Sequence, residues 1–550
     1  MKLLFSQYTI YNISFKMKHK IISLLVILFT SYQFTSAQSS KNEPYFGETC
    51  TSITVGKKAS YDGSVMTAHT CDGNYRTWMR IEKAMDYPDT ARMTIYKGLL
   101  KTETPWDMRN VKVAGQIPQA KHTYAFLNTG YPSMNEKQLA IGEATIVGND
   151  TLVNENGMFL IEELERVVLQ RCTTAREAIK LIDSLTKKYG YGDWGECLTI
   201  ADKNEVWQLE IFGVGKNKIG AVWAAKRIPD DEVGVSANIS RISTIEKNNP
   251  NFFMYSDNVF SVAKELNLWD GNSDFKFWKA YGDTKKPYAI REFWILSHVN
   301  PDLSLNMDMA ELPFSVKPKQ KMTIDMMNAL YRADYENSPY DMRKNVKMAS
   351  TKRDKDGKVI GKDTIVSPIA NPWLTANTRN TLNTIKPGTI DFVRTVSVSW
   401  CAYSHIIQLR GWLPDEVGGL CRISFDNPAQ SPRIPLFSGT TQLPPAFEYS
   451  GVRTYNDNAA IWKFRKANKL ATVQWGSTKD IMLENIHSFE EKAKMELPQI
   501  EAKAQALLKE RKKEEAQKLL NGYTEQFYGA ATQKWGNLEN RFWEMFGSGF

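Results

Sequence analysis

The sequence lacks an apolar stretch long enough to hold a mature chain in a membrane. Its most apolar run, IISLLVILF at 21–29, is shorter than the ~20 residues that a membrane-spanning helix needs. The chain also lacks a marked charge excess, since 70 Lys and Arg against 61 Asp and Glu leave a net charge of +9 over 550 residues. No basic run is interleaved with aromatic residues, and no internal repeat is found. These absences argue against nucleic acid as a partner and against stable membrane association.

Cysteine is scarce as well, with 6 residues in 550, which is too few for a scaffold built on disulfides. In an oxidising compartment all of them would be disulfide candidates, although the pairing cannot be read from the sequence. If Cys50 stays free, an odd number remains, and at least one more cysteine must be unpaired. The cysteines are Cys50, Cys71, Cys172, Cys197, Cys401 and Cys421.

The first residues have the pattern of a secretory signal. MKHK from Met17 supplies a basic start, 21–29 is the apolar region, and TSA at 35–37 is a small-residue cleavage site. We therefore predict a signal peptide over 1–37, with Met17 as an alternative start of translation and a buried strand or helix as the alternative interpretation. The expected product is exported, either periplasmic or extracellular.

The rest of the chain predicts an α+β fold. With 42% hydrophobic and 24% charged residues, the composition is that of a globular protein. Asp62-Gly63 separates strand-like stretches at 51–56 and 64–69, a pattern that predicts a β-hairpin. Residues 159–190 have apolar residues at helical spacing and predict two helices broken near 172–174. Further strand-like runs lie at 138–148, 196–202, 206–213, 220–228, 395–400 and 404–412. Strands, helices and strands in this order indicate layered sheets covered by helices.

Two segments differ from this pattern. Residues 250–385 are less periodic and rich in Pro, Asn and Asp, and we interpret them as an insertion that walls the site. Residues 478–550 form a predicted C-terminal helical segment, in which 490–520 read as one charged amphipathic helix. A solvated helix that packs one stripe on the body is favoured there over a binding role.

Cys50 stands between the leader and the first predicted strand. A cysteine exposed as the first residue of a chain carries both a thiol and a free α-amino group. The pKa of such an amine is ~7.7–8.0, so it can act as the general base for its own side chain. Cutting between Thr49 and Cys50 would create a nucleophile and its base together. A buried or disulfide-bonded cysteine is the alternative.

A resemblance favours the nucleophile. CTSITVGKKASYDGSVMTAH at 50–69 resembles the start of the dipeptidases of the N-terminal-nucleophile cysteine hydrolase class, whose mature chains begin Cys-Thr. The likeness continues in WAAKRIPDDEVGVSANISRI (223–242), in 257–283, in 312–342 and in YSHIIQLRGWLP (403–414). In this order the blocks cover roughly residues 50 to 475.

The resemblance implies a four-layer αββα fold, autoproteolytic exposure of Cys50, and hydrolysis of dipeptides without metal or organic cofactor. It also implies kinship with penicillin V acylases and bile salt hydrolases. The expected domains are a propeptide over 38–49, a peptidase domain over 50–477 that contains the insertion, and the helical segment 478–550. Homo-oligomerisation stays open.

The resemblance also implies roles for residues near the nucleophile. The family segment Ala-Arg-Asn-x-Asp falls on 68–72, so Asp72 is expected to hold the amine of Cys50 or of the substrate. His69 stands where the family has Arg and is expected to bind substrate, with a pKa near ~6.5 that would alter the pH dependence. A metal site formed by His69 and Cys71 lacks a third nearby ligand. A strand-end ion pair for Asp72 and a solvent-facing His69 are the structural alternatives.

Four more residues are candidates. Asn238, in SANISRI, matches a family Asn that helps to build the oxyanion hole, and Arg241 in the same segment is a candidate for substrate binding. Glu143, mid-strand among apolar neighbours, would face the pocket and bind a substrate amine, or form a structural salt bridge. Other members of the class bring an arginine from far along the chain near the thiol, and Arg394 is the candidate for it. His405 and Arg410 are the alternatives for this role. The structural alternative for Asn238 is an ordinary turn residue. For Arg394, His405 and Arg410 it is a strand residue whose charged end lies in solvent.

Taken together, these residues predict an exported cysteine dipeptidase acting through an acyl-enzyme on Cys50. An amidohydrolase of the acylase type with the same nucleophile is the first alternative. A dipeptidase should have charged groups for both ends of its substrate, whereas an acylase should have an apolar cavity. The second alternative is an exported binding protein whose site has decayed, with His69 as its best support and an inert Cys50 as its consequence.

Overall fold

A computed structural model describes residues 48–549 of the chain. The chain divides into two units, Met1–Gly47 and Glu48–Phe550, and only the second is described. The predicted signal peptide (1–37), and all of the predicted propeptide before residue 48, lie outside the described residues. No helix of the described part is long and apolar enough to cross a membrane.

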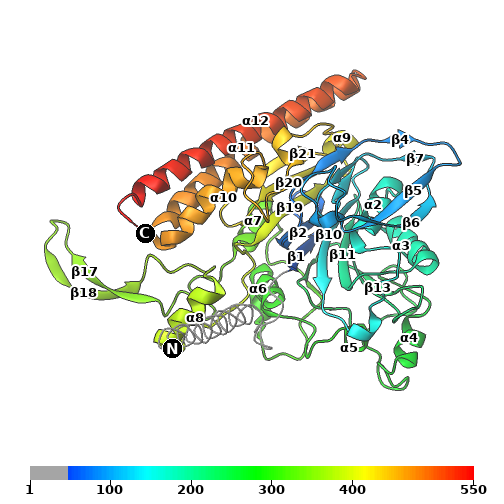
Figure 1. Ribbon diagram of the computed structural model, residues 1–550, viewed down its shortest axis with the longest axis horizontal. Coiled ribbons are helices and arrows are strands. Elements are labelled where there is room, and N and C mark those ends of the chain that lie inside the picture. The colour runs from blue at the N-terminus through cyan, green and yellow to red at the C-terminus, as the bar shows by residue number, and fades with distance from the viewer. Residues whose placement is uncertain (1–47, 550) are drawn as a thin grey trace, which may run out of the picture. The chain divides into compact units, whose positions relative to one another are not determined.

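Two antiparallel sheets form the centre of the described unit (Figure 1). The seven-stranded sheet has the order β16-β14-β1-β2-β19-β20-β21, and the eight-stranded sheet has the order β15-β13-β12-β11-β10-β9-β8-β3. The strands of the first sheet are β1 (Glu48–Val55), β2 (Val65–Gly73), β14 (Val233–Ser236), β16 (Ser315–Val316), β19 (Cys401–Leu409), β20 (Gly419–Phe425) and β21 (Ile434–Phe437). Those of the second are β3 (Arg80–Glu82), β8 (Phe126–Asn128), β9 (Met134–Asn135), β10 (Ala140–Ile146), β11 (Gly195–Ala201), β12 (Val206–Phe212), β13 (Val222–Arg227) and β15 (Phe253–Tyr255).

The hairpin of β1 and β2 lies in the middle of the seven-stranded sheet, as the Asp62-Gly63 signal predicts. Gly63 has a φ of 84°, which favours glycine, and Asp62 Oδ1 accepts hydrogen bonds from the backbone and hydroxyl of Ser64. The register places Cys50 opposite Cys71. Both strands pack against β10 and β11 of the other sheet, so β2 is buried along its whole length.

Helices cover the outer faces of both sheets. On the eight-stranded side lie α2 (Ile161–Arg171) and α3 (Ala175–Tyr189), and the break between them confirms the one predicted near Cys172. Thr174 caps α3 in a capping box with Glu177. On the other side lie α6 (Ile290–Val299), α10 (Ala460–Ala471), α11 (Trp475–Lys509) and α12 (Lys513–Met545). The order helix, sheet, sheet, helix is the predicted four-layer α+β arrangement (Figure 1).

The segment before β19 differs from the prediction. Residues 395–400 were expected to form a strand, but β19 begins only at Cys401. Ser397 donates its backbone N–H to Ala333 O, and its carbonyl accepts from the Trp373 indole and the Thr395 hydroxyl. These partners lie in connecting segments and in its own turn, so the β-branched composition of this stretch is overridden by tertiary contacts.

The C-terminal segment also differs from the single helix predicted over 490–520. Arg511 adopts a left-handed φ of 62°, which ends α11, and α12 starts at Lys513. The chain reverses there, and α11 and α12 pack side by side (Figure 1). Leu520, Phe527 and Trp535 are buried along α12, so this helix contributes a continuous apolar stripe to the core.

The remaining elements lie mostly in the segment predicted as an insertion and at the rim of the sheets. The helices are α4 (Val259–Glu265), α5 (Phe277–Tyr281), α7 (Ile324–Arg332), α8 (Ala376–Ile385) and α9 (Asp415–Gly418). The two-stranded sheets pair β4 (Met85–Asp86) with β7 (His122–Thr123), β5 (Arg92–Lys97) with β6 (Lys112–Pro118), and β17 (Lys347–Arg353) with β18 (Val359–Val366).

Candidate active site

Cys50 is the third residue of β1 and is fully buried. Side chains alternate between the two faces of a strand, so the thiol shares the face toward the eight-stranded sheet with the side chains opposite it on β2 and β10. Burial and the neighbouring Cys71 thiol raise the pKa of Cys50 well above its ordinary value. The structure contains the Thr49–Cys50 peptide bond, and in this uncut form the thiol is protonated at neutral pH and needs a base before it can attack.

Asn238 binds the backbone of Cys50. Its Oδ1 accepts a hydrogen bond from Cys50 N at 3.2 Å, and its Nδ2 donates to Thr145 O at 2.5 Å. Asn238 has a φ of 68°, a left-handed conformation that asparagine adopts more readily than most residues. The amide therefore holds the nitrogen that cutting after Thr49 would free, and it keeps one N–H that none of these bonds uses.

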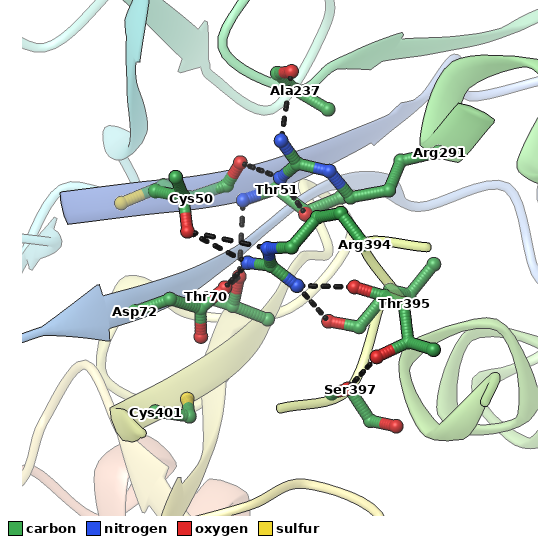
Figure 2. A network of polar contacts seen from close by, with 12 residues as sticks. Cys50, Thr51, Thr70, Asp72, Ala237, Arg291, Arg394, Thr395, Ser397 and Cys401 are labelled. Atoms are coloured by element: carbon green, nitrogen blue, oxygen red, sulfur yellow. Dashed lines mark hydrogen bonds and ion pairs between the residues drawn. The ribbon is translucent and has the colours of Figure 1, made fainter. Parts of the chain in front are cut away.

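Arg291, in the first turn of α6, is a site residue that the sequence did not indicate. Its Nη1 donates to Cys50 O at 2.7 Å and to Thr51 Oγ1 at 2.9 Å. Its Nη2 donates to Asn238 Oδ1 at 2.6 Å. It also donates to Ala237 O at 3.1 Å (Figure 2). One buried guanidinium thus fixes the nucleophile strand and the Asn238 amide relative to each other.

Asp72 and Arg394 form an ion pair next to Thr49. Arg394 Nη2 lies 2.7 Å from Asp72 Oδ2 and 2.9 Å from Thr49 Oγ1 (Figure 2). Thr70 donates its hydroxyl to the same carboxylate oxygen and accepts Thr51 N. Thr49, Thr70 and Asp72 alternate with Cys50 and its neighbours, so this ion pair lies on the other face of the sheet, with the backbone of Cys50 between it and the thiol.

We expect Asp72→Asn to destabilise the protein and to slow the cut before Cys50. Removing the carboxylate leaves the Arg394 guanidinium, only 13% exposed, without its charge partner, which costs about 3 kcal/mol or more. Urea unfolding and intact mass during expression measure the two effects.

Asp426→Asn is the matched control, because Asp426 is fully buried and paired to Arg465 at 2.7 Å, while its hydrogen bonds go to Ala402, Arg465 and Asn468. A similar loss of stability is expected for it, with normal processing. If both variants are processed equally fast, Asp72 has no role in processing beyond stability.

Glu143 lies on the thiol side of the sheet. Its carboxyl is fully buried, and this burial raises its pKa to about 7, although hydrogen bonds with Glu196, Cys50 and Thr145 oppose the shift. The pKa of Glu196 is also raised well above its usual range, by burial and by Glu143. Burial therefore favours the protonated form of both carboxyls, and Glu143 has a carboxylate oxygen within 4.8 Å of the Cys50 thiol.

His69 is buried rather than solvent-facing. Its Nδ1 lies 2.5 Å from Glu143 O and 3.2 Å from Glu143 N, which holds the ring against the backbone of β10. Burial lowers the pKa of His69 to about 4, so the expectation that it titrates near pH 6.5 is wrong, and the ring is neutral at ordinary pH. The predicted contact with substrate stays a prediction.

A cluster that could hold a metal exists on this face. Cys50, His69 and Glu143 place one ligand atom each within 4.8 Å of one another, a donor set of the kind that binds zinc. The sequence suggested only His69 and Cys71, because Glu143 is distant in the chain. No step of the function proposed below uses a metal.

Arg241 and Arg410 lie away from this group, whereas His405 lies beside it. Arg241 donates its guanidinium to Val235 O and Pro313 O and has none of the contacts that would support the predicted substrate binding. Arg410 is paired to Glu501 at 2.6 Å. His405 lies next to His69, with ring centroids 5.2 Å apart. Arg394, His405 and Arg410 were the candidates for a basic residue near the thiol. Of these three, Arg394 is the one that contacts Thr49, next to Cys50.

Comparison with known proteins identifies the family. A sequence model described as peptidase family C69 matches residues 49–488, which begin one residue before the candidate nucleophile. The chain belongs to peptidase family C69. As a member of this family it is a cysteine-type peptidase.

Family C69 relatives are dipeptidases by name. The chain is 25% identical over 397 residues to a probable dipeptidase of Latilactobacillus sakei, which covers 71% of this chain and 74% of that protein. It is 22% identical to dipeptidase A of Lactobacillus helveticus, covering 78% and 82% of the two chains. Among solved structures, penicillin V acylase from Agrobacterium tumefaciens matches with a TM-score of 0.27 and 12% identity, over 70% of this chain and 86% of that one.

Proposed function

We propose that this peptidase is an exported dipeptidase whose nucleophile is Cys50 after a cut between Thr49 and Cys50. The observation that carries the proposal is the position of the Cys50 backbone nitrogen, bound by Asn238 at 3.2 Å between the thiol on one face and the Asp72–Arg394 pair on the other. The named dipeptidases of the same family support the choice of substrate.

The cut would begin as an attack of Cys50 Sγ on the Thr49 carbonyl carbon. A carbon–sulfur bond forms, the peptide carbon–nitrogen bond breaks, and the thiol proton ends on the departing amine. Water then hydrolyses the thioester, which returns the thiol and leaves Thr49 with a carboxylate. The Arg291 hydrogen bonds to Cys50 O and Asn238 keep the strand fixed during this shift.

Hydrolysis of a dipeptide would repeat the same chemistry. The freed α-amine accepts the thiol proton, and the thiolate attacks the substrate carbonyl. The unused N–H of Asn238 Nδ2 and backbone N–H groups would hold the oxyanion. The leaving amine takes the proton from the α-ammonium of Cys50, and water releases the first residue from the thioester.

Charged groups on both sides of the Cys50 backbone favour a dipeptide over an acylase substrate. Thr49 is the acyl group of the uncut chain, and its hydroxyl is bound by Arg394 at 2.9 Å. The first residue of a dipeptide would lie in the same place, with its ammonium next to Asp72 or Glu143. An apolar acyl chain would bring no ammonium to pair with a buried carboxylate.

The test is a panel of substrates on the processed protein. We expect hydrolysis of free dipeptides, with N-acetylated dipeptides at least about 100-fold poorer because they lack the ammonium. Faster cleavage of penicillin V than of any dipeptide would favour the acylase alternative. A correctly cut protein that hydrolyses neither would favour the binding protein.

Export is part of this proposal and rests on the pattern of residues 17–37, outside the described residues. Expression of the full chain followed by cell fractionation tests it. Deletion of residues 1–37 is expected to keep the protein in the cytoplasm.

Glu143→Gln is expected to reduce the pH dependence of stability in the uncut Cys50→Ala protein. A folded pKa of about 7 against ~4.3 in the unfolded chain means that the folded state binds more protons between these values. The free energy of unfolding therefore falls as pH rises through this window. With Gln, we expect the fall between pH 5 and pH 8 to shrink by about 2 kcal/mol, measured by urea unfolding.

Glu246→Gln is the control, because Glu246 is exposed and its replacement should leave the pH dependence unchanged. An unaltered pH dependence in Glu143→Gln would show that Glu143 is already ionised in the folded chain at pH 5.

A further inference from the structure

A cavity of about 430 Å³ lies between the seven-stranded sheet and helices α7 and α11. Met66 and Gln408, which are paired across β2 and β19, contribute to its lining. Side chains of successive strand residues point to opposite faces of a sheet, and Met66 is an odd number of residues from His69 and Cys71 on β2. The cavity therefore lies on the face of the sheet opposite the Cys50 thiol. Its volume is typical of a small-molecule site.

Most of the charged residues around the cavity are paired with each other or with a neighbour. Lys494 lies 2.7 Å from Asp325, and Arg410 lies 2.6 Å from Glu501. Glu490 forms an ion pair with Arg332. The fourth acid of the lining, Asp62, accepts hydrogen bonds from Ser64 and Gln408.

Two guanidinium groups remain. Arg422 donates to Gln408 Oε1 at 3.0 Å, and Arg433 donates to Asn328 Oδ1 at 2.9 Å. In the described part of the chain, neither forms an ion pair, although Glu501 and Asp62 act on Arg422 at longer range. Against these two cations only Asp62 is left without a cationic partner, so the cavity keeps one positive charge in excess.

One guanidinium nitrogen of Arg433 lacks a hydrogen-bond partner. Its Nη2 is buried without a hydrogen bond while the residue is only 9% exposed. Burial lowers the pKa of both Arg422 and Arg433 to about 10, and both are therefore cationic at neutral pH. A buried charged donor without an acceptor costs free energy, which an anion in the cavity would recover.

The rest of the lining is mostly apolar, apart from Tyr61 and Thr323. Its apolar residues include Met66, Met322, Ile324, Phe489 and Leu497. A bound molecule would therefore need a single anionic end for the arginines and an apolar body for these walls.

We propose that this cavity binds an amphiphilic monocarboxylate, with its carboxylate between Arg422 and Arg433 and its apolar body between the sheet and α11. The site is separate from Cys50 and does not depend on the function proposed above.

Isothermal titration of the full chain with decanoate tests the proposal. We expect saturable one-to-one binding, with decan-1-ol and inorganic phosphate each at least tenfold weaker, because each supplies only one half of the ligand. Equal binding of phosphate would mean an inorganic anion site, equal binding of decan-1-ol would mean a purely apolar one, and absence of binding would remove the site. Each of these three results overturns the proposal.

Variants locate the binding. Arg422→Gln and Arg433→Gln should each weaken decanoate binding at least tenfold, while the exposed Arg92→Gln should not. Ala493→Phe, which fills the cavity and keeps its charges, should abolish binding, and circular dichroism verifies that each variant is folded. Cys50→Ala should bind as the unaltered chain does. Loss of binding in Cys50→Ala, or retention in Ala493→Phe, would place the ligand elsewhere and overturn the proposal.

Discussion

Replacing Cys50 by Ala is expected to lower kcat/KM for every dipeptide by at least about 10⁴-fold, because the sulfur forms the acyl-enzyme bond and no other group can replace it. The variant should fold, since alanine fits the space of the fully buried thiol and removes only one atom. Steady-state hydrolysis followed by amine release measures the loss.

Cys421→Ala is the control for this experiment. Cys421 is equally buried in the same sheet but lies on β20, outside the contacts around Cys50. Its replacement should change kcat/KM by less than about threefold. Equal activity of Cys50→Ala and the unaltered enzyme would mean that another residue is the nucleophile.

The second large effect is expected for Arg291→Lys. The planar guanidinium of Arg291 donates to four acceptors, which are Cys50 O, Thr51 Oγ1, Asn238 Oδ1 and Ala237 O. A lysine has a single ammonium nitrogen in place of this planar group, so it cannot donate to all four. Asn238 would lose its fixed orientation. We expect kcat/KM to fall about 10²–10³-fold, with most of the loss in kcat, and the cut before Cys50 to slow in parallel.

Arg465→Lys is the matched control for Arg291→Lys. Arg465 is also a buried arginine, paired to Asp426 at 2.7 Å, and its replacement costs stability without touching the site. If Arg465→Lys lowers kcat as much as Arg291→Lys does, the effect reports general destabilisation. A rise in KM alone for Arg291→Lys would contradict a positioning role.

The sequence predicted the local parts of the site better than the distant ones. The hairpin that carries Cys50 and Asp72 follows from a turn signal and strand alternation, both of which act within a few residues. Arg291 was missed because its contact with Cys50 joins residues 241 positions apart. The sequence around Arg291 has only a weak hydrophobic periodicity, which did not indicate a site residue. The one local signal was a charged residue at the start of a short apolar helix.

Burial explains where the sequence misled. His69 was expected to titrate near its ordinary value, but two packed sheets remove it from water and lower its pKa to about 4. Arg241 was expected to bind substrate because it lies in the same segment as Asn238, yet its buried guanidinium donates to Val235 O and Pro313 O. Neither the sheet packing nor these contacts can be read from residue types alone.

The central claim is that Cys50 becomes the first residue of the active chain. N-terminal sequencing and intact mass of the purified exported protein, next to Cys50→Ala, test it directly. We expect the unaltered protein to start at Cys50, and Cys50→Ala to retain Thr49 and the residues before it. An unaltered protein that starts near Gln38 and keeps Thr49 would have no free amine at Cys50, and the proposed mechanism would be wrong.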